Sequence, residues 1–182
     1  MTPHIRSTLA ILALVLLQGP AHAQGMAKAD YEQRKDRLAA EYKVDKAACS
    51  KLAGNAADIC KAEAKGKDKV ALAELKHAYT GKAADLTKLQ EAKAHAAYDV
   101  ADERCDDLAG QPHDVCEQEA KAAKTKALAD AKMGKEVRES RRDASQDKTD
   151  ADYKVAVEKC DALSGAGKSD CVSAAKRQFG KN

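Results

Sequence analysis

Three cysteine pairs of identical spacing constrain the fold of this chain more than any other feature. Each pair encloses ten residues, and the pairs are Cys49 with Cys60, Cys105 with Cys116, and Cys160 with Cys171. An even number of regularly spaced cysteines in an exported protein indicates a disulfide framework. Because the spacing repeats, we expect three local bridges rather than any other connectivity.

A longer sequence repeat surrounds each cysteine pair. Seven positions recur at identical offsets and without a gap in three copies. The copies are Tyr42, Cys49, Leu52, Gly54, Cys60, Ala64 and Lys65; Tyr98, Cys105, Leu108, Gly110, Cys116, Ala120 and Lys121; and Tyr153, Cys160, Leu163, Gly165, Cys171, Ala175 and Lys176. Self-similarity of this kind indicates one supersecondary unit that is used three times.

Each copy predicts two antiparallel helices around a turn. Residues seven apart share a helix face, so Tyr42 and Cys49 form a stripe that Leu52 continues. Glycine commonly ends a helix, and we therefore expect the first helix to end at Gly54. The two cysteines then lie at nearly equal heights, where a disulfide can join them. The predicted fold is all-α: three disulfide-stapled antiparallel helical hairpins, joined by helical or flexible connectors into an elongated molecule.

Polar residues after the glycine are predicted to cap the second helix of each hairpin. Asn55 takes this position in the first copy. Gln111 takes it in the second copy and is followed by Pro112, which suits the first helical position.

Large apolar residues are scarce. By count over residues 24–182, 21 of 159 are Leu, Ile, Val, Phe or Met, which is few for an ordinary globular domain. Alanine supplies most of the apolar fraction, and it favours helix strongly but buries little surface. We expect small separate cores of Leu and Tyr around the bridges, with each disulfide contributing about 2–4 kcal/mol. Low net charge and high helix propensity count against disorder.

The domain organisation follows from the repeat. We expect hairpins at residues 24–80, 81–133 and 153–182, with a break at Tyr79-Thr80-Gly81 between the first two. Residues 134–152 carry eleven charged side chains and few apolar ones. They are predicted to be either a solvated helix or a mobile linker.

Residues 1–23 resemble a secretory signal. Arg6 precedes an apolar run from Leu9 to Leu17, and Pro20 and Ala21-His22-Ala23 follow it. The run is shorter than the roughly 20 residues that span a membrane. We expect cleavage after Ala23 and a periplasmic chain without a transmembrane segment, the alternative being an uncleaved anchor.

Charge and motifs exclude several functions. The formal net charge is +3 for the whole chain and falls to +2 without Arg6, which argues against nucleic acid as a partner. No close cysteine pair, glycine-rich phosphate loop or exposed serine nucleophile is present, so no catalytic residue and no cofactor is predicted. The adjacent carboxylates Asp106 and Asp107 are interpreted as solvated helix surface.

A metal site at the second hairpin turn would require His113 to join Cys105 and Cys116 as a ligand. Oxidised cysteines do not bind metal, and the other copies have no histidine there, so His113 is predicted to be an exposed loop residue. His77 and His95 do not form a zinc-binding pair on one helical turn. We therefore predict no metal site.

Two resemblances follow from these residues. The Ala-, Lys- and acid-rich stretch from Ala120 to Lys132 resembles the long helical spacer of the TolA family of cell-envelope proteins. The repeat itself resembles the repeats of small exported Ala- and Lys-rich proteins of Gram-negative bacteria, some of which carry a TolA-like label. TolA proteins have a membrane anchor and a C-terminal globular domain. This chain shows neither, so the resemblance does not imply an energy-transducing role.

The function expected from these observations is that of a non-enzymatic periplasmic structural or protein-interaction protein of the cell envelope. Its partner would be another protein or a second copy of itself. The alternative is a stress-related periplasmic binding module, either chaperone-like or binding a metal or small ligand.

Overall fold

The computed structural model describes residues 26–181, and within that range the chain forms helices and turns only. The five helices are α1 Lys28–Cys49, α2 Asn55–Thr80, α3 Ala83–Cys105, α4 Gln111–Cys160 and α5 Gly165–Gln178. Three helical hairpins result, and the predicted all-α fold is confirmed. The proposed signal, residues 1–23, lies outside the described residues.

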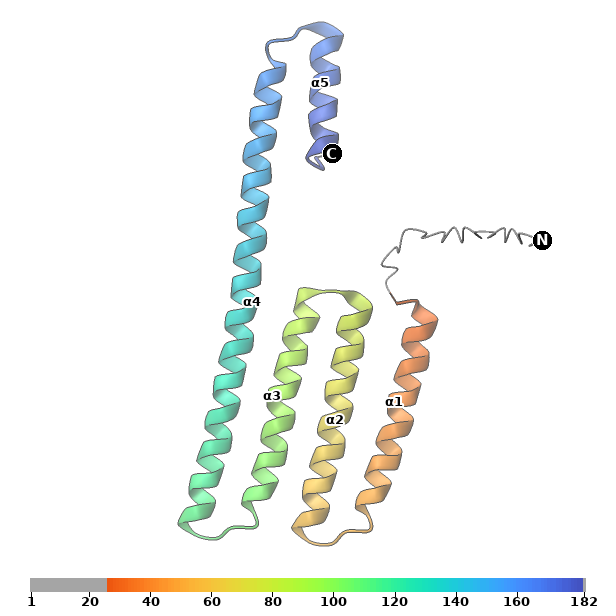
Figure 1. Ribbon diagram of the computed structural model, residues 1–182, viewed down its shortest axis with the longest axis vertical. Helices are drawn as coiled ribbons and strands as arrows, with labels where there is room; N and C mark the ends of the chain where they lie inside the picture. Colours follow the sequence, from red (N-terminus) through yellow and green to blue (C-terminus); the bar gives the residue numbers. More distant parts are fainter. Residues whose placement is uncertain (1–25, 182) are drawn as a thin grey trace, which may run out of the picture.

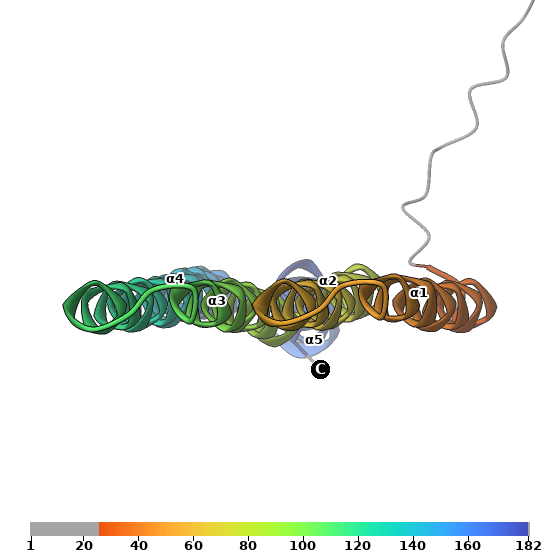
Figure 2. The same cartoon turned by 90° about the horizontal axis from the view of Figure 1, so that it is seen from below.

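The first two hairpins form a flat layer. Helices α1, α2, α3 and the N-terminal half of α4 stand side by side, each antiparallel to the next (Figure 1). Viewed along the helix axes, the layer is one helix thick (Figure 2). Within the described residues each helix packs only against its neighbours in sequence. Both faces of the layer are therefore open, and α1 and α4 form its two edges.

Helix α4 links this layer to the third hairpin. It has 50 residues and a length of about 75 Å, and its C-terminal half rises beyond the layer to pack against α5 (Figure 1). Residues 134–152 are helical throughout. Of the two structures that the sequence left open for them, the helix is the one adopted.

Side-chain pairs four residues apart stabilise the exposed middle part of α4, where few other residues pack against the helix. Lys132 lies 3.9 Å from Glu136, and Lys135 lies 4.0 Å from Glu139. Further along, the Gln146 amide donates a hydrogen bond of 2.6 Å to Asp150. Each such pair four residues apart contributes a few tenths of a kcal/mol to an exposed helix, roughly 0.2–0.5 kcal/mol.

The hairpin turns differ from the prediction. Helix α1 ends at Cys49 rather than at Gly54, and Leu52 lies in the turn with 47% of its surface exposed. Gly54 has φ +58° and ψ −151° and comes directly before α2. Glycine adopts such a positive φ without a steric penalty. The expected continuation of the apolar stripe to Leu52 is therefore wrong. The chain needs the residues after the bridge to reverse direction, so the helix stops at the cysteine.

The predicted cap at Asn55 is also wrong. Asn55 is the first residue of α2 and makes no capping hydrogen bond with its side chain. Its Nδ2 atom instead donates to the backbone carbonyl of Glu103 on α3, at 2.7 Å. This contact joins the first hairpin turn to the second hairpin. The cap prediction also fails in the second copy, where Gln111 begins α4 and Pro112 is its second residue, one position later than predicted.

The interior is built mainly from alanine and lies between hairpins as well as within them. Leu75 and Leu89 are the only large aliphatic residues buried in the described chain. Between α2 and α3, a Cβ atom placed on Gly66 would lie 2.9 Å from the Cβ of Ala96. The two helices therefore approach closely at this point. The expected separate cores of Leu and Tyr are not formed, because Leu52, Leu108 and Leu163 all lie exposed in turns.

The break between the first two hairpins falls where the sequence predicted it. Helix α2 ends at Thr80, and Gly81 follows with φ +62° and donates its N–H to the His77 carbonyl. This is the usual left-handed end of a helix. The Thr80 hydroxyl donates a 2.6 Å hydrogen bond to Asp85 at the start of α3.

Candidate functional site

Each hairpin is closed at its turn by a disulfide, and the three bridges have the predicted pairing. The Cα–Cα distances are 5.5 Å for Cys49–Cys60, 5.6 Å for Cys105–Cys116 and 5.7 Å for Cys160–Cys171. The first cysteine of each pair is at most 1% exposed. The bridges are therefore structural elements of the turns. Disulfides of this kind are typical of proteins from oxidising compartments.

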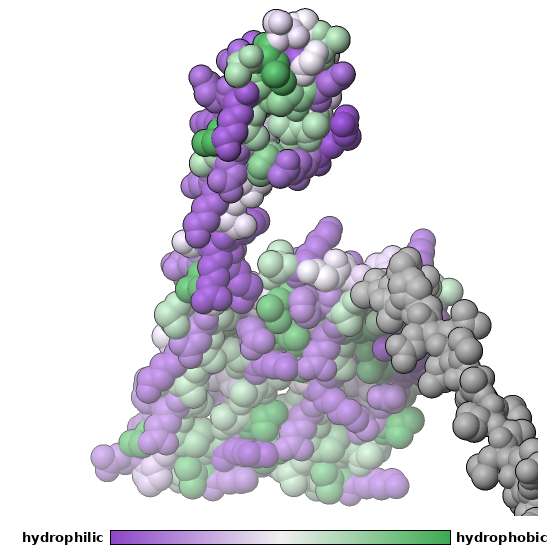
Figure 3. Space-filling view, turned by 45° about the horizontal axis from the view of Figure 1, so that its top comes forward, coloured by the Kyte–Doolittle hydropathy of each residue, from purple (hydrophilic) through white to green (hydrophobic). Residues whose placement is uncertain are grey.

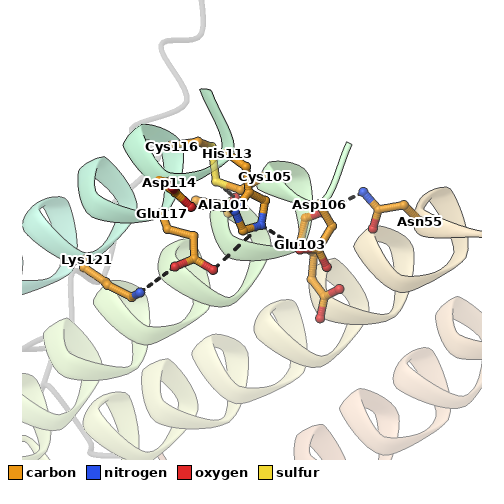
Figure 4. A network of polar contacts seen from close by, with 10 residues as sticks. All are labelled: Asn55, Ala101, Glu103, Cys105, Asp106, His113, Asp114, Cys116, Glu117 and Lys121. Atoms are coloured by element: carbon orange, nitrogen blue, oxygen red, sulfur yellow. Dashed lines mark hydrogen bonds and ion pairs between the residues drawn. A yellow bond between two sulfur atoms is a disulfide. The ribbon is translucent and has the colours of Figure 1, made fainter. Parts of the chain in front are cut away.

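A cluster of charged side chains surrounds the second bridge (Figure 4). The His113 ring, on the first turn of α4, lies 3.5 Å from Asp106, 3.5 Å from Asp114 and 3.8 Å from Glu117. Glu117 in turn lies 2.7 Å from Lys121. Asp106 belongs to the turn after α3, so the histidine links the two sides of the hairpin.

Charged neighbours shift the pKa values of two groups in this cluster, His113 and Glu117. Hydrogen bonding to Asp114 is the main cause that raises the pKa of His113, with Asp106 and Glu117 acting in the same direction. The ammonium group of Lys121 lowers the pKa of Glu117. A protonated His113 therefore has carboxylate partners on α4 and on the preceding turn.

The two cysteines of this bridge are not available as metal ligands. Cys105 and Cys116 are bonded to each other, so neither can join His113 as a thiolate ligand. His77 contacts the Lys82 carbonyl at 3.3 Å. Between residues 26 and 181, the structure contains no group of three His, Cys, Asp or Glu side chains placed to hold a metal ion.

One polar cluster was not foreseen from the sequence. Asp85 and Thr87, at the start of α3, are 6% and 7% exposed. The Thr80 hydroxyl lowers the pKa of Asp85, and Arg138 of α4 donates a 2.8 Å hydrogen bond to the Thr87 hydroxyl. The cluster fixes the α2–α3 turn against α4. The sequence gives no signal for it, because Arg138 is 51 residues from Thr87.

A groove of about 380 Å³ crosses the ends of α1, α2 and α3 on one face of the layer. Its charged lining mixes both signs: Lys46, Lys61 and Lys65 with Asp58, Asp99, Asp102 and Glu103. Lys65 already lies 4.0 Å from Asp99. The groove therefore offers neither a concentrated charge nor an apolar cavity to a small ligand.

The exposed apolar residues form a different kind of surface. Eight large ones are at least 45% exposed in the described chain, and they include Val44 on α1 and Val115, Met133 and Val137 on α4. Polar and apolar residues alternate over the face seen in Figure 3, without a broad apolar patch. Most of these side chains lie on the edge helices of the layer or in the hairpin turns, and Val155 lies on the part of α4 beyond the layer.

Residues 26–181 include no helix with the apolar length that a bilayer crossing requires. Comparison of the chain with protein-family models, with curated proteins and with solved structures finds no match. The resemblance to TolA-like proteins thus remains a prediction, and the function has to be argued from the geometry of the helical layer itself.

Proposed function

We propose that this protein is a non-enzymatic structural or protein-interaction component of the periplasmic cell envelope. It would be exported with cleavage after Ala23, and its helices would serve as docking surfaces for another protein chain. The observation that carries the proposal is the one-helix-thick layer, whose faces and edge helices are left uncovered by residues 26–181 (Figure 2).

The edge helices are suited to protein contact. Val44 on α1 is 69% exposed, and Met133 on α4 is 58% exposed. Side chains of this type lose water favourably when a second surface covers them, and interfaces are enriched in methionine. Three disulfides hold the turns, so the edges are presented on a scaffold that is already ordered before binding.

The charge pattern also favours a protein partner. Acidic and basic side chains are paired over the surface, as in Lys93 with Glu74 at 2.9 Å and Arg104 with Glu63 at 2.8 Å. A surface without a concentrated basic stripe gives little attraction to nucleic acid or anionic lipid.

The direct test is chemical crosslinking in intact envelopes, followed by purification of the tagged, oxidised protein. We expect a defined partner that is crosslinked through α1 or α4, and a purified chain that begins at Gln24. Substituting Val44→Glu and Met133→Glu should reduce the crosslinked yield, since each places a charge in the contact. The matched control is Val155→Glu, which lies on the C-terminal half of α4 and is also exposed.

Two results would contradict the proposal. A chain recovered from the cytoplasm with Met1 in place would remove the envelope role. A melting temperature that rises on addition of a metal or small molecule, without any crosslinked protein, would favour a binding module.

A further inference from the structure

We infer that the two edges of the layer bind each other in successive copies of this chain, so that α1 of one copy packs against the N-terminal half of α4 of the next. The inference rests on the proposed interaction role and specifies its partner as a second copy. It follows from the internal repeat, because the chain already contains one example of the same contact.

That example is the contact between α2 and α3, where the first hairpin meets the second. Gly66 faces Ala96 at its centre. Val100 lies one turn from Ala96 on the same side of α3, and Ile59 lies two turns from Gly66 on the same side of α2. All four residues are buried or partly buried.

The repeat of 56 residues places matching residues on the two edges. Ala40 and Val44 of α1 correspond to Ala96 and Val100 of α3. On α1 both residues are exposed, and Val44 reaches 69%. Helix α1 therefore has the residues with which α3 contacts α2, but none of the other described helices covers them.

Helix α4 has the complementary surface. Val115, Ala122, Ala129 and Met133 correspond to Ile59, Gly66, Ala73 and His77 of α2. These α4 residues are all exposed, whereas their counterparts on α2 are buried or partly covered. The four recur at intervals of seven and four residues and so form one stripe along α4.

The directions of the helices agree with this pairing. Helix α1 runs antiparallel to α4, as α3 runs antiparallel to α2 (Figure 1). A second copy set beside α4 would extend the flat layer by one more antiparallel helix. The third hairpin rises beyond the layer, so it leaves the edge of α4 accessible (Figure 1).

An ion pair is preserved as well. Lys93 of α3 lies 2.9 Å from Glu74 of α2. The residues at the same repeat positions are Arg37 on α1 and Asp130 on α4, which again have opposite charge. In the same register as α2 and α3, this pair would meet across the contact between copies.

Two differences make the contact between copies weaker than the internal one. Ala122 replaces Gly66, so the two helices stand slightly further apart. Lys43 replaces Asp99 and faces Lys121, where the internal contact has Lys65 beside Asp99. The association should therefore depend on protein concentration. Since one edge binds a different edge, it forms open rows rather than closed dimers.

Sedimentation velocity of the oxidised, exported protein tests this directly. The wild type should form species larger than a monomer as its concentration is raised. Val44→Glu disrupts the α1 edge and Val115→Glu disrupts the α4 edge, so each variant alone should lose all association. An equimolar mixture should regain association but stop at dimers, because each variant keeps one intact edge.

Val155→Glu is the matched control, since Val155 occupies the same repeat position as Val44 in the third copy and is 54% exposed. It should associate like the wild type, and circular dichroism should show all three variants folded. A wild type that stays monomeric would overturn the inference, yet a different protein crosslinked in envelopes would still support the proposed function. Association that survives Val44→Glu, or that the mixture does not restore, would also overturn it.

Discussion

The first two hairpins and the third share one sequence motif but differ in what surrounds them. In the layer, α2 packs against α1 and α3, and α3 packs against α2 and α4. In the part of the chain that the structure describes, the third hairpin consists of the C-terminal half of α4 and α5, and α5 packs against α4 alone. The comparison separates the stabilising contacts that a disulfide-linked hairpin receives from neighbouring helices from those that it makes within itself.

The third hairpin supplies local contacts in place of neighbours. The rings of Tyr153 and Phe179 meet edge to face, with centroids 6.2 Å apart. Lys181 forms an ion pair with Asp150, and this pair lowers the pKa of Asp150. Together with the Cys160–Cys171 bridge, these contacts hold a helix of 14 residues, a length that is marginal for an isolated helix.

Removing one bridge at a time should affect hydrogen-exchange protection very differently in the third hairpin and in the layer. We expect this to be the largest difference between the two regions. Each bridge closes a loop of similar size and contributes about 2–4 kcal/mol. In Cys160→Ser/Cys171→Ser, we expect α5 to detach and its amides to exchange with solvent quickly. In Cys105→Ser/Cys116→Ser, helix α3 should stay protected because α2 still packs against it. Hydrogen exchange resolved by residue measures both. If α5 lost as little protection without the third bridge as α3 loses without the second, lateral packing would not be what stabilises the layer.

Replacing a helical glycine by alanine should change the free energy of unfolding in opposite directions in the two regions. Gly66→Ala places a Cβ atom 2.9 Å from Ala96 and should lower the free energy of unfolding by about 1 kcal/mol, since overpacking outweighs the gain in helix propensity. Gly167→Ala on α5 meets nothing within 4 Å and should raise it by about 0.5 kcal/mol. Urea unfolding midpoints, followed by circular dichroism, provide the comparison. A stabilising Gly66→Ala would mean that α2 and α3 are not closely packed in solution.

A smaller effect is expected from pH at the second turn. The pKa of His113 is raised in the folded state by Asp114, Asp106 and Glu117. Because the pKa is higher in the folded than in the unfolded chain, protonated His113 stabilises the fold. This contribution is complete at pH values below the unfolded pKa of about 6.5. It is lost as the pH rises through the folded pKa. The difference in melting temperature between wild type and His113→Gln should therefore be larger at acidic pH than at alkaline pH. The third hairpin lacks this histidine, so protection of α5 should not change with the substitution.

Much of the fold follows from features that are local in sequence. The bridges could be predicted because two cysteines eleven residues apart meet around a single turn. The break at Gly81 and the place of Pro112 in the first turn of α4 follow from backbone preferences that these residues carry anywhere. The turn details could not be predicted in the same way. Gly54 can end one helix or precede the next, and the structure places it directly before α2.

The sequence by itself determined three helical hairpins and their disulfides, because helix propensity, turn residues and cysteine spacing act over a few residues. Only the tertiary structure decided that two hairpins join in a flat layer while the third stands apart. That choice depends on contacts between residues distant in sequence, such as Gly66 with Ala96 and Arg138 with Thr87. Small residues such as Gly66 and Ala96 leave no periodic apolar signal, and their role appears only when two helices lie side by side.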